Sequence, residues 1–131
     1  MATENLLFCK TYSLSSDYNA LSASTDLFTF VKLGDTNTTV NQSIASSTVE
    51  APIGINQELA KKGEGVQVGM IGISKLRLAG TVARGNFIRA TTNGEGVLHL
   101  GLGIAAARAL ESGVDNDHIT VQILNGFATG A

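Results

Sequence analysis

The sequence predicts an all-β fold, in which a small β-barrel over residues 26–131 follows an extended N-terminal arm over residues 1–25. Two observations lead to this prediction. A long stretch after residue 64 alternates apolar and polar residues with a period of two, and glycines divide much of the remaining chain into short apolar pieces. Period-two alternation is typical of a strand, because successive side chains point to opposite faces of a sheet. At 131 residues, the chain is most simply one domain.

The predicted arm is rich in serine, and its apolar side chains follow no clean period. Leu6, Phe8, Tyr12 and Tyr18 are the largest of these side chains that we expect to make contacts. Because the segment has too little periodic apolar sequence to form its own core, we expect it to become ordered only where a partner buries these side chains. The alternative is that it packs on its own barrel as an additional edge strand.

Two strand patterns follow the arm. Residues 27–33 place Leu27, Thr29, Val31 and Leu33 on one face of a strand, which ends at the turn signal "GD". Residues 28, 30 and 32 form the other face, so both faces are expected to be at least partly covered. Pro52 then opens the strand-like "IGIN", a position where its missing N–H group is tolerated.

The clearest strand pattern lies in "GVQVGMIGISKLRL". One face carries the larger apolar side chains, namely Val66, Val68, Met70, Leu76 and Leu78. The other face is mostly polar but includes Ile71 and Ile73. An exposed pair of isoleucines would be a sticky patch, so we expect another layer or another subunit to cover Ile71 and Ile73.

Glycine-rich corners and a repeat complete the barrel pattern. Gly80, Gly85 and "TTNGEG" separate short apolar pieces, as expected where a small barrel turns sharply. The segments "GINQELAKKGEGVQVGMI" and "GIAAARALESGVDNDHITVQIL" share a Gly-Ile start, a glycine turn and alternating aliphatic residues, which predicts the same hairpin twice. Local propensity in "IAAARALESG" favours a helix, but the repeat favours a strand there.

The sharpest apparent cofactor motif is "GLGIAA" at residues 101–106, which matches the G-x-G-x-x-A pattern of dinucleotide-binding folds. That fingerprint requires a βαβ unit and an acidic residue about 20 positions further on, where this chain has "ITVQIL". We therefore interpret the glycines as a kink where barrel strands bend, and we expect no cofactor.

Metal and nucleophile chemistry find little support in the sequence. Zinc needs three or four convergent ligands, so the isolated His99 and His118 are interpreted as surface or turn residues. The "DND" at residues 115–117 lacks the glycine and distal glutamate of a calcium loop and predicts an Asx turn. The serines lack a G-x-S-x-G elbow, and Cys9 has only Lys10 beside it. We expect no metal site and no enzymatic activity.

Charge and cysteine content narrow the partners and the compartment. The formal net charge is -2, and six of the nine basic residues lie between residues 61 and 89, where only Phe87 could stack on a base. A solvated or protein-facing surface is therefore the preferred interpretation, without nucleic acid. The single cysteine and the start "MATENLLFCKTYS", which has neither a basic region nor a long apolar run, predict a soluble cytoplasmic product with no membrane contact.

An ordered series of segments resembles a known protein family. The series runs from "FTFVKLGD" through "IGINQELAKKGEGVQVGMIGISKLRLAGTVARGNFI" to "GIAAARALESGVDNDHITVQILNG" and covers about residues 27–126. It is similar to the small capsid decoration, or cement, proteins of tailed bacteriophages; no single segment is specific, whereas the order is moderately so. The resemblance implies a β-barrel or tulip-like fold and brings no catalytic residues.

The resemblance also implies a structural role on a virion. Proteins of this family bind the outer surface of an expanded head, and many form trimers, so the implied partners are the major capsid protein and further copies of the chain. The protein would be made in the host cytoplasm and stabilise the shell by bridging capsomers. An extended arm could add a strand to a capsid sheet. The candidate capsid or subunit contacts are Leu6, Phe8, Tyr12, Tyr18, Ile71 and Ile73.

Two other functions remain open at this point. A carbohydrate-binding or adhesive β-module on a virion surface would present exposed aromatic side chains, of which this chain has a small supply, five Phe and two Tyr. A nucleic-acid-binding barrel would rest on the basic middle of the chain alone, and its binding would weaken with added salt.

Overall fold

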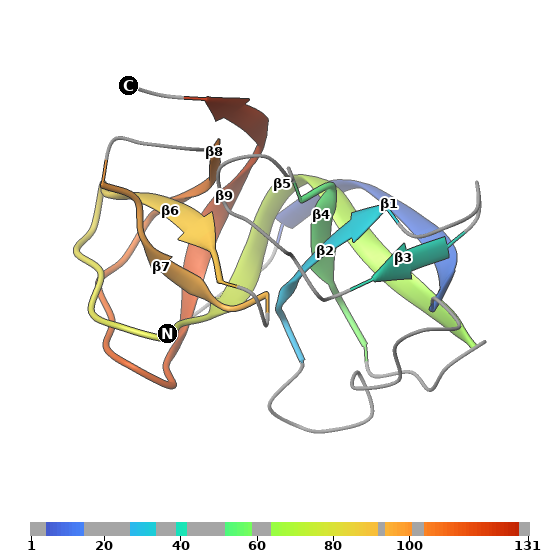
Figure 1. The fold of residues 1–131 in the computed structure, drawn as a ribbon, viewed down its shortest axis with the longest axis horizontal. Helices are drawn as coiled ribbons and strands as arrows, with labels where there is room; N and C mark the ends of the chain where they lie inside the picture. The colour runs from blue at the N-terminus through green and yellow to red at the C-terminus, as the bar shows by residue number, and fades with distance from the viewer. Residues whose placement is uncertain are drawn as a thin grey trace.

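The computed structural model describes residues 5–14, 27–33, 39–41, 52–58, 64–91, 94–100 and 104–128. In these segments every regular element is a strand, so the all-β prediction is confirmed (Figure 1). The strands are β1 (Asn5–Leu14), β2 (Phe30–Leu33), β3 (Thr39–Asn41), β4 (Gly54–Asn56), β5 (Gly65–Arg77), β6 (Phe87–Ala90), β7 (Gly96–Leu98), β8 (Ile104–Ala109) and β9 (His118–Ala128).

The long strand β5 organises the molecule. Its alternation is the one that the sequence predicts: Val66, Val68 and Leu76 are buried, and Ile71 on the opposite parity is exposed. Its first part pairs with β1 and β4, and its last part, from Ile73 to Arg77, pairs with β9. One strand thus belongs to two neighbouring parts of a single sheet, which lie side by side in Figure 1.

The first part is a closed ring of five strands in the order β1-β3-β2-β4-β5, with β1 pairing back to β5. The β1–β3 pair is parallel, and the other pairs are antiparallel. Its interior is filled by Tyr12, Val31, Val40, Val66 and Val68. Pairing of β1 with both β5 and β3 closes this ring into a small barrel, although β1 meets β3 only at Ser13 and Leu14.

The second part continues from β5 through β9, β8, β6 and β7 in antiparallel pairs. A parallel bridge between Leu78 and Gly96 brings β7 back to the end of β5. The larger core cluster fills this ring and includes Leu76, Leu78, Ile88 and Ile119. The prediction of a small β-barrel is therefore confirmed, and the barrel consists of two rings that share β5.

The structure corrects the predicted arm over residues 5–14. These residues form β1 and pair antiparallel with β5, from Asn5 opposite Ile73 to Ser13 opposite Gly65. Register shifts between Leu6 and Phe8 and between Phe8 and Cys9 interrupt the ladder. A shifted ladder breaks the period of two, which explains why the sequence shows no clean pattern there. The chain's own barrel, the alternative partner for this segment, accommodates β1.

The predicted strand over residues 27–33 is shorter in the structure. Leu27 and Phe28 form a turn, with Phe28 at a φ of 58°, and β2 begins only at Phe30. Thr29, Phe30 and Val31 are all buried, which agrees with the expectation that both faces of this segment are covered. The repeat prediction is confirmed: β4 pairs with β5 and β8 pairs with β9, each antiparallel.

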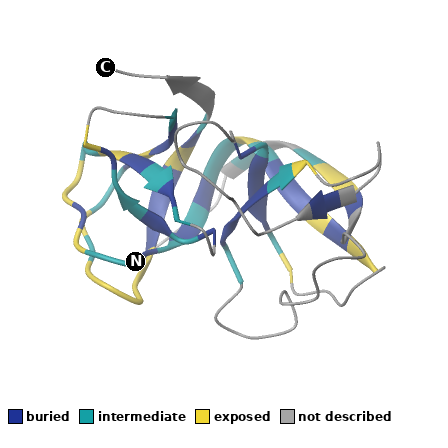
Figure 2. Cartoon of the chain, viewed as in Figure 1, coloured by how far each residue is buried: buried dark blue, intermediate teal, exposed yellow. Residues whose placement is uncertain are grey.

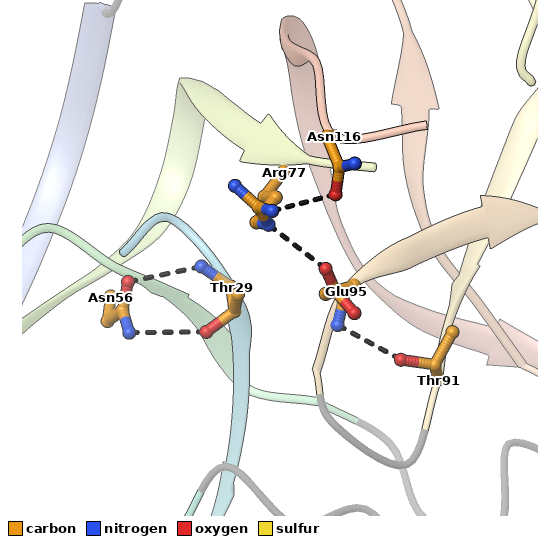
Figure 3. A network of polar contacts seen from close by, with 6 residues as sticks. All are labelled: Thr29, Asn56, Arg77, Thr91, Glu95 and Asn116. Carbon is orange, nitrogen blue, oxygen red and sulfur yellow. Dashed lines mark hydrogen bonds and ion pairs between the residues drawn. The ribbon is translucent and has the colours of Figure 1, made fainter. Parts of the chain in front are cut away.

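Two polar contacts join elements that are distant in sequence (Figure 3). Arg77 Nε donates to Glu95 Oε2 at 3.0 Å, and Arg77 Nη2 donates to Asn116 Oδ1 at 2.7 Å. These bonds fix the end of β5 to the segment before β7 and to the β8–β9 turn. Near the first ring, the Thr29 N–H donates to Asn56 Oδ1 at 3.1 Å, and Asn56 Nδ2 donates to Thr29 Oγ1 at 3.3 Å.

Candidate interaction surface

A cleft of about 370 Å³ lies on the outer side of the sheet where β5 and β9 part. The β5–β9 ladder ends at the pair Ile73 and Gln122. Beyond this pair β5 turns toward β1 and β4, with Gly72 at a φ of 118°, a conformation that glycine adopts without steric cost. The cleft therefore results from one strand serving two rings. Its lining is Ile71, Gly72, Ile73, Leu110, Gln122 and Ile123.

The walls of this cleft are mostly aliphatic. Ile71 is 45% exposed, whereas Ile73 and Leu110 are half-buried and Ile123 reaches into the larger core. Aliphatic side chains that remain exposed around a cleft mark a place where another surface can bury them. Ile71 and Ile73 thus lie where the sequence places them, opposite the core face of β5, and the chain itself leaves them partly open.

A cationic side chain stands beside the cleft. Arg108 is the direct cross-strand partner of Gln122, which in turn pairs with Ile73. The Arg108 guanidinium lies 5.6 Å from the ring centre of Phe87, and its Nε donates to Gly85 O at 3.4 Å. Phe87 is 38% exposed. We define the β5–β9 surface as the cleft together with Arg108 and Phe87.

The two N-terminal candidates whose side chains the structure describes, Leu6 and Tyr12, pack against the cores. Leu6 is partly buried against the larger core, and its methyl groups lie beside Gly69. Tyr12 is 8% exposed inside the first ring, with its hydroxyl 3.9 Å from Met70 Sδ. Phe8 is the backbone partner of Ile71, and Tyr18 lies outside the described residues. Tyr12 is therefore a core residue of this chain, which corrects its assignment as a capsid contact.

Among the predicted residues whose side chains the structure describes, Ile71 and Ile73 meet at the cleft, and Leu6 and Tyr12 do not line it. Sequence reasoning missed Leu110, Gln122, Ile123 and Arg108, which come from the β8–β9 hairpin. The alternation of "ITVQIL" could have placed Gln122 on an outer face. No sequence signal sets the register of that hairpin against β5, so the cleft itself was not predictable.

The two histidines differ in environment. His99 is 9% exposed, so the prediction that it lies at the surface is wrong. Its backbone N–H donates to the Phe87 carbonyl oxygen just after the end of β7. His118 is exposed at the start of β9, with its ring 5.7 Å from Phe28 in an edge-to-face contact. Partial burial lowers the pKa of His118 below 6.5, and the nearby charges of Arg77 and Lys75 lower it further.

The remaining sequence motifs have structural roles. Val114 N–H donates to Asp117 Oδ2 at 2.9 Å, so Asp117 holds the turn by bonding the backbone three residues before it, not two residues on as in the predicted Asx turn. Residues 101–103 of "GLGIAA" lie outside the described part, and the residues that follow form β8, so the helix that a dinucleotide fingerprint requires is not formed.

The segments that the structure describes contain neither a metal-binding cluster nor a membrane-spanning helix. No group of three or more His, Cys, Asp or Glu side chains that could hold a metal ion occurs there. No helix in the same segments is long and apolar enough to cross a membrane.

Comparison with known proteins gives a match of fold. No protein-family model matches the sequence, and no curated protein matches it. Among solved structures, the chain is similar to the head fiber gp8.5 N base of bacteriophage phi29, with a TM-score of 0.65 and 13% sequence identity. The match covers 95% of this chain and 98% of that chain. The two proteins share a fold over nearly their whole lengths.

Proposed function

We propose that this chain is a structural protein of a bacteriophage virion, which binds the outside of the head and stabilises the shell by bridging capsomers. In this proposal it acts as a homo-oligomer, with a trimer favoured, and has no enzymatic activity and no cofactor. Its partner is the major capsid protein.

One observation carries the proposal: the likeness to a phage head fiber base extends over 95% of this chain and 98% of that chain. The match spans nearly all of both chains, so a role on a phage head is the function that we transfer to this chain. The segment series that resembles cement proteins supports the same class of partner. Fold likeness is an analogy, and the surface must supply the binding.

The structure has the physical properties that such a role requires. A protein that bridges capsomers must be stiff, and two rings sharing β5 make a stiff body because one strand contributes side chains to both packed cores. It must also adhere, and the β5–β9 surface offers aliphatic walls beside a cation. Repetition over a symmetric shell makes modest contacts effective through avidity.

A second candidate is the base of a projecting fiber that attaches to the head without bridging capsomers. The likeness of fold to the phi29 head fiber base favours it. The carbohydrate-binding alternative gains less support. Of the aromatic side chains that the structure describes, Phe87 alone is exposed, whereas Tyr12 and Phe30 are buried and Phe28 is half-buried.

The test is to add the purified protein to expanded heads that lack it and to determine a cryo-EM map. We expect density on the outer surface at contacts between capsomers, and a higher temperature of DNA release from the decorated heads. Density confined to single capsomers, with no change in DNA release, would favour the fiber base. If the protein neither binds the heads nor occurs in particles of the phage that encodes it, the proposal fails.

A further inference from the structure

The β5–β9 surface has a defined chemical complement. Its walls, Ile71, Ile73 and Leu110, accept an aliphatic side chain, and Arg108 beside them accepts a carboxylate. The nearby carboxylate of Glu111 is already engaged, because it accepts the Thr120 N–H at 2.8 Å, a bond that lowers the pKa of Glu111. The surface therefore fits an aliphatic residue that is followed by an acidic one.

This chain carries such a pair at the tip of the β8–β9 hairpin. Val114 is 54% exposed, and Asp115 and Asp117 beside it are exposed as well (Figure 2, where the turn lies at the lower left). Both acidic residues lie on the C-terminal side of the exposed valine, one directly after it and one three residues on. Its chemistry matches that of the cleft in both the apolar and the charged part.

The tip is held in a fixed shape before any contact forms. Asp117 Oδ2 accepts the Val114 N–H at 2.9 Å, and Asn116 Oδ1 accepts Arg77 Nη2 at 2.7 Å. The backbone of Leu78 bonds to the turn twice, through Asp117 O at 2.8 Å and the Asn116 N–H at 2.9 Å. A pre-organised turn loses little conformational freedom on binding, which favours association.

The tip of a chain cannot enter the cleft of the same chain. The turn is bonded to Leu78, whereas the cleft begins at Ile73, five residues back along the extended strand, or roughly 17 Å at the usual rise per residue. A contact between tip and cleft must therefore join two copies. Because the two patches differ, the contact is heterologous, and it generates a ring if the rotation between copies closes.

We infer that Val114 of one copy inserts into the cleft of the next, with Asp115 of that copy paired to Arg108. The contact is repeated head to tail around a closed ring. The inference rests on the homo-oligomer part of the proposed function, but it does not depend on attachment to a head. From the sequence, we expect another layer or another subunit to cover Ile71 and Ile73, and in this inference the turn of a neighbouring copy takes that role.

A charge exchange tests the pairing. Sedimentation velocity over a dilution series gives the association constant of the unchanged protein and of the variants Arg108→Glu, Asp115→Arg and the double variant. We expect each single reversal to weaken association at least about tenfold, and the double variant to return to within about threefold of the unchanged protein. Val114→Ser should weaken association without any change of charge.

The matched control is Lys10→Glu. Lys10 is an exposed cation on an aromatic ring, as Arg108 is, with its Nζ 5.1 Å from the ring centre of Tyr12, but it lies in β1 of the first ring. This variant should associate like the unchanged protein. Melting temperatures of all variants show whether a loss of association reflects unfolding. If Arg108→Glu proves to be unfolded, Val114→Ser and Asp115→Arg still test the inference, because both residues lie at an exposed turn.

Three results would overturn the inference: a protein that is monomeric at all concentrations, single reversals that associate normally, or a double variant as weak as the singles. Binding to heads is measured separately on the same variants. If Arg108→Glu abolishes head binding while association is normal, the cleft belongs to the capsid; the inference fails and the proposed function stands. If neither the unchanged protein nor any variant binds heads, but the double variant recovers the association that the single variants lose, the proposed function fails and the inference stands.

Discussion

At the scale of single residues, the buried pair of Asn56 and Thr29 is the most sensitive polar contact. Both residues are fully buried, and the Asn56 amide replaces a backbone partner for the Thr29 N–H. Asn56→Ala leaves that N–H without this acceptor and adds a small void, so we expect the free energy of unfolding to fall by about 2–4 kcal/mol. Urea denaturation measures the change.

The control for this prediction is Thr29→Val. It removes only the hydroxyl that accepts Asn56 Nδ2 and keeps both the shape of the side chain and the backbone bond. The expected loss is about 1 kcal/mol. Equal losses for both variants would show that the backbone bond carries no particular weight.

The environment of His118 predicts a dependence of stability on pH. Its pKa in the folded protein lies below the ordinary 6.5, so the unfolded chain binds the proton more tightly. The contribution of His118 to stability is therefore complete above about pH 6.5 and is lost as the pH falls through the lower, folded pKa. His118→Gln should reduce the difference in melting temperature between pH 7.5 and pH 5.5. An unchanged difference would assign that dependence to other groups.

At the scale of elements, Gly54 shows how closely β4 approaches β5. A Cβ atom at Gly54 would overlap the carbonyl oxygen of Gly69 and lie 2.7 Å from Val68 Cγ1. Since the backbone of a paired strand cannot yield, we expect Gly54→Ala to destabilise the protein by about 1–3 kcal/mol or more. Gly80→Ala is the matched control, because its Cβ would meet only Val97 Cγ1, at 4.0 Å. Chemical denaturation of both variants should separate them clearly.

The elements differ in how far the sequence alone could predict them. β5 was predictable because its alternation is regular, and the helix-prone segment of β8 was predictable as a strand only through its likeness to the β4–β5 hairpin. β1 was not, because a shifted ladder with β5 hides its period. For the same reason Tyr12 resembled a free contact residue, although it completes the core of the first ring. Isoleucines of the cleft were predictable, and their partners from β9 were not.

At the scale of the whole molecule, sharing β5 couples the two rings. Val66 fills the first ring and Leu76 the second, yet both are side chains of one strand. We expect a single unfolding transition. Leu76→Ala should lower the free energy of unfolding by about 2–5 kcal/mol, and Val66→Ala should lower it by less. Differential scanning calorimetry with each variant tests this. Two separated transitions, each shifted by only one variant, would mean that the rings unfold independently.

The long-range partner of β1 also determines when the protein can fold during its synthesis. The ribosome makes β1 first, but the residues that pair with it along most of its length belong to β5, which emerges much later. The first ring cannot close fully before β5 has been made as far as Ile73, and the second must wait for β9. Such non-local pairing folds slowly and leaves early strands with unpaired edges. The nascent chain therefore spends most of its translation as an aggregation-prone precursor, and a chaperone that shields β1 would raise the yield of folded protein.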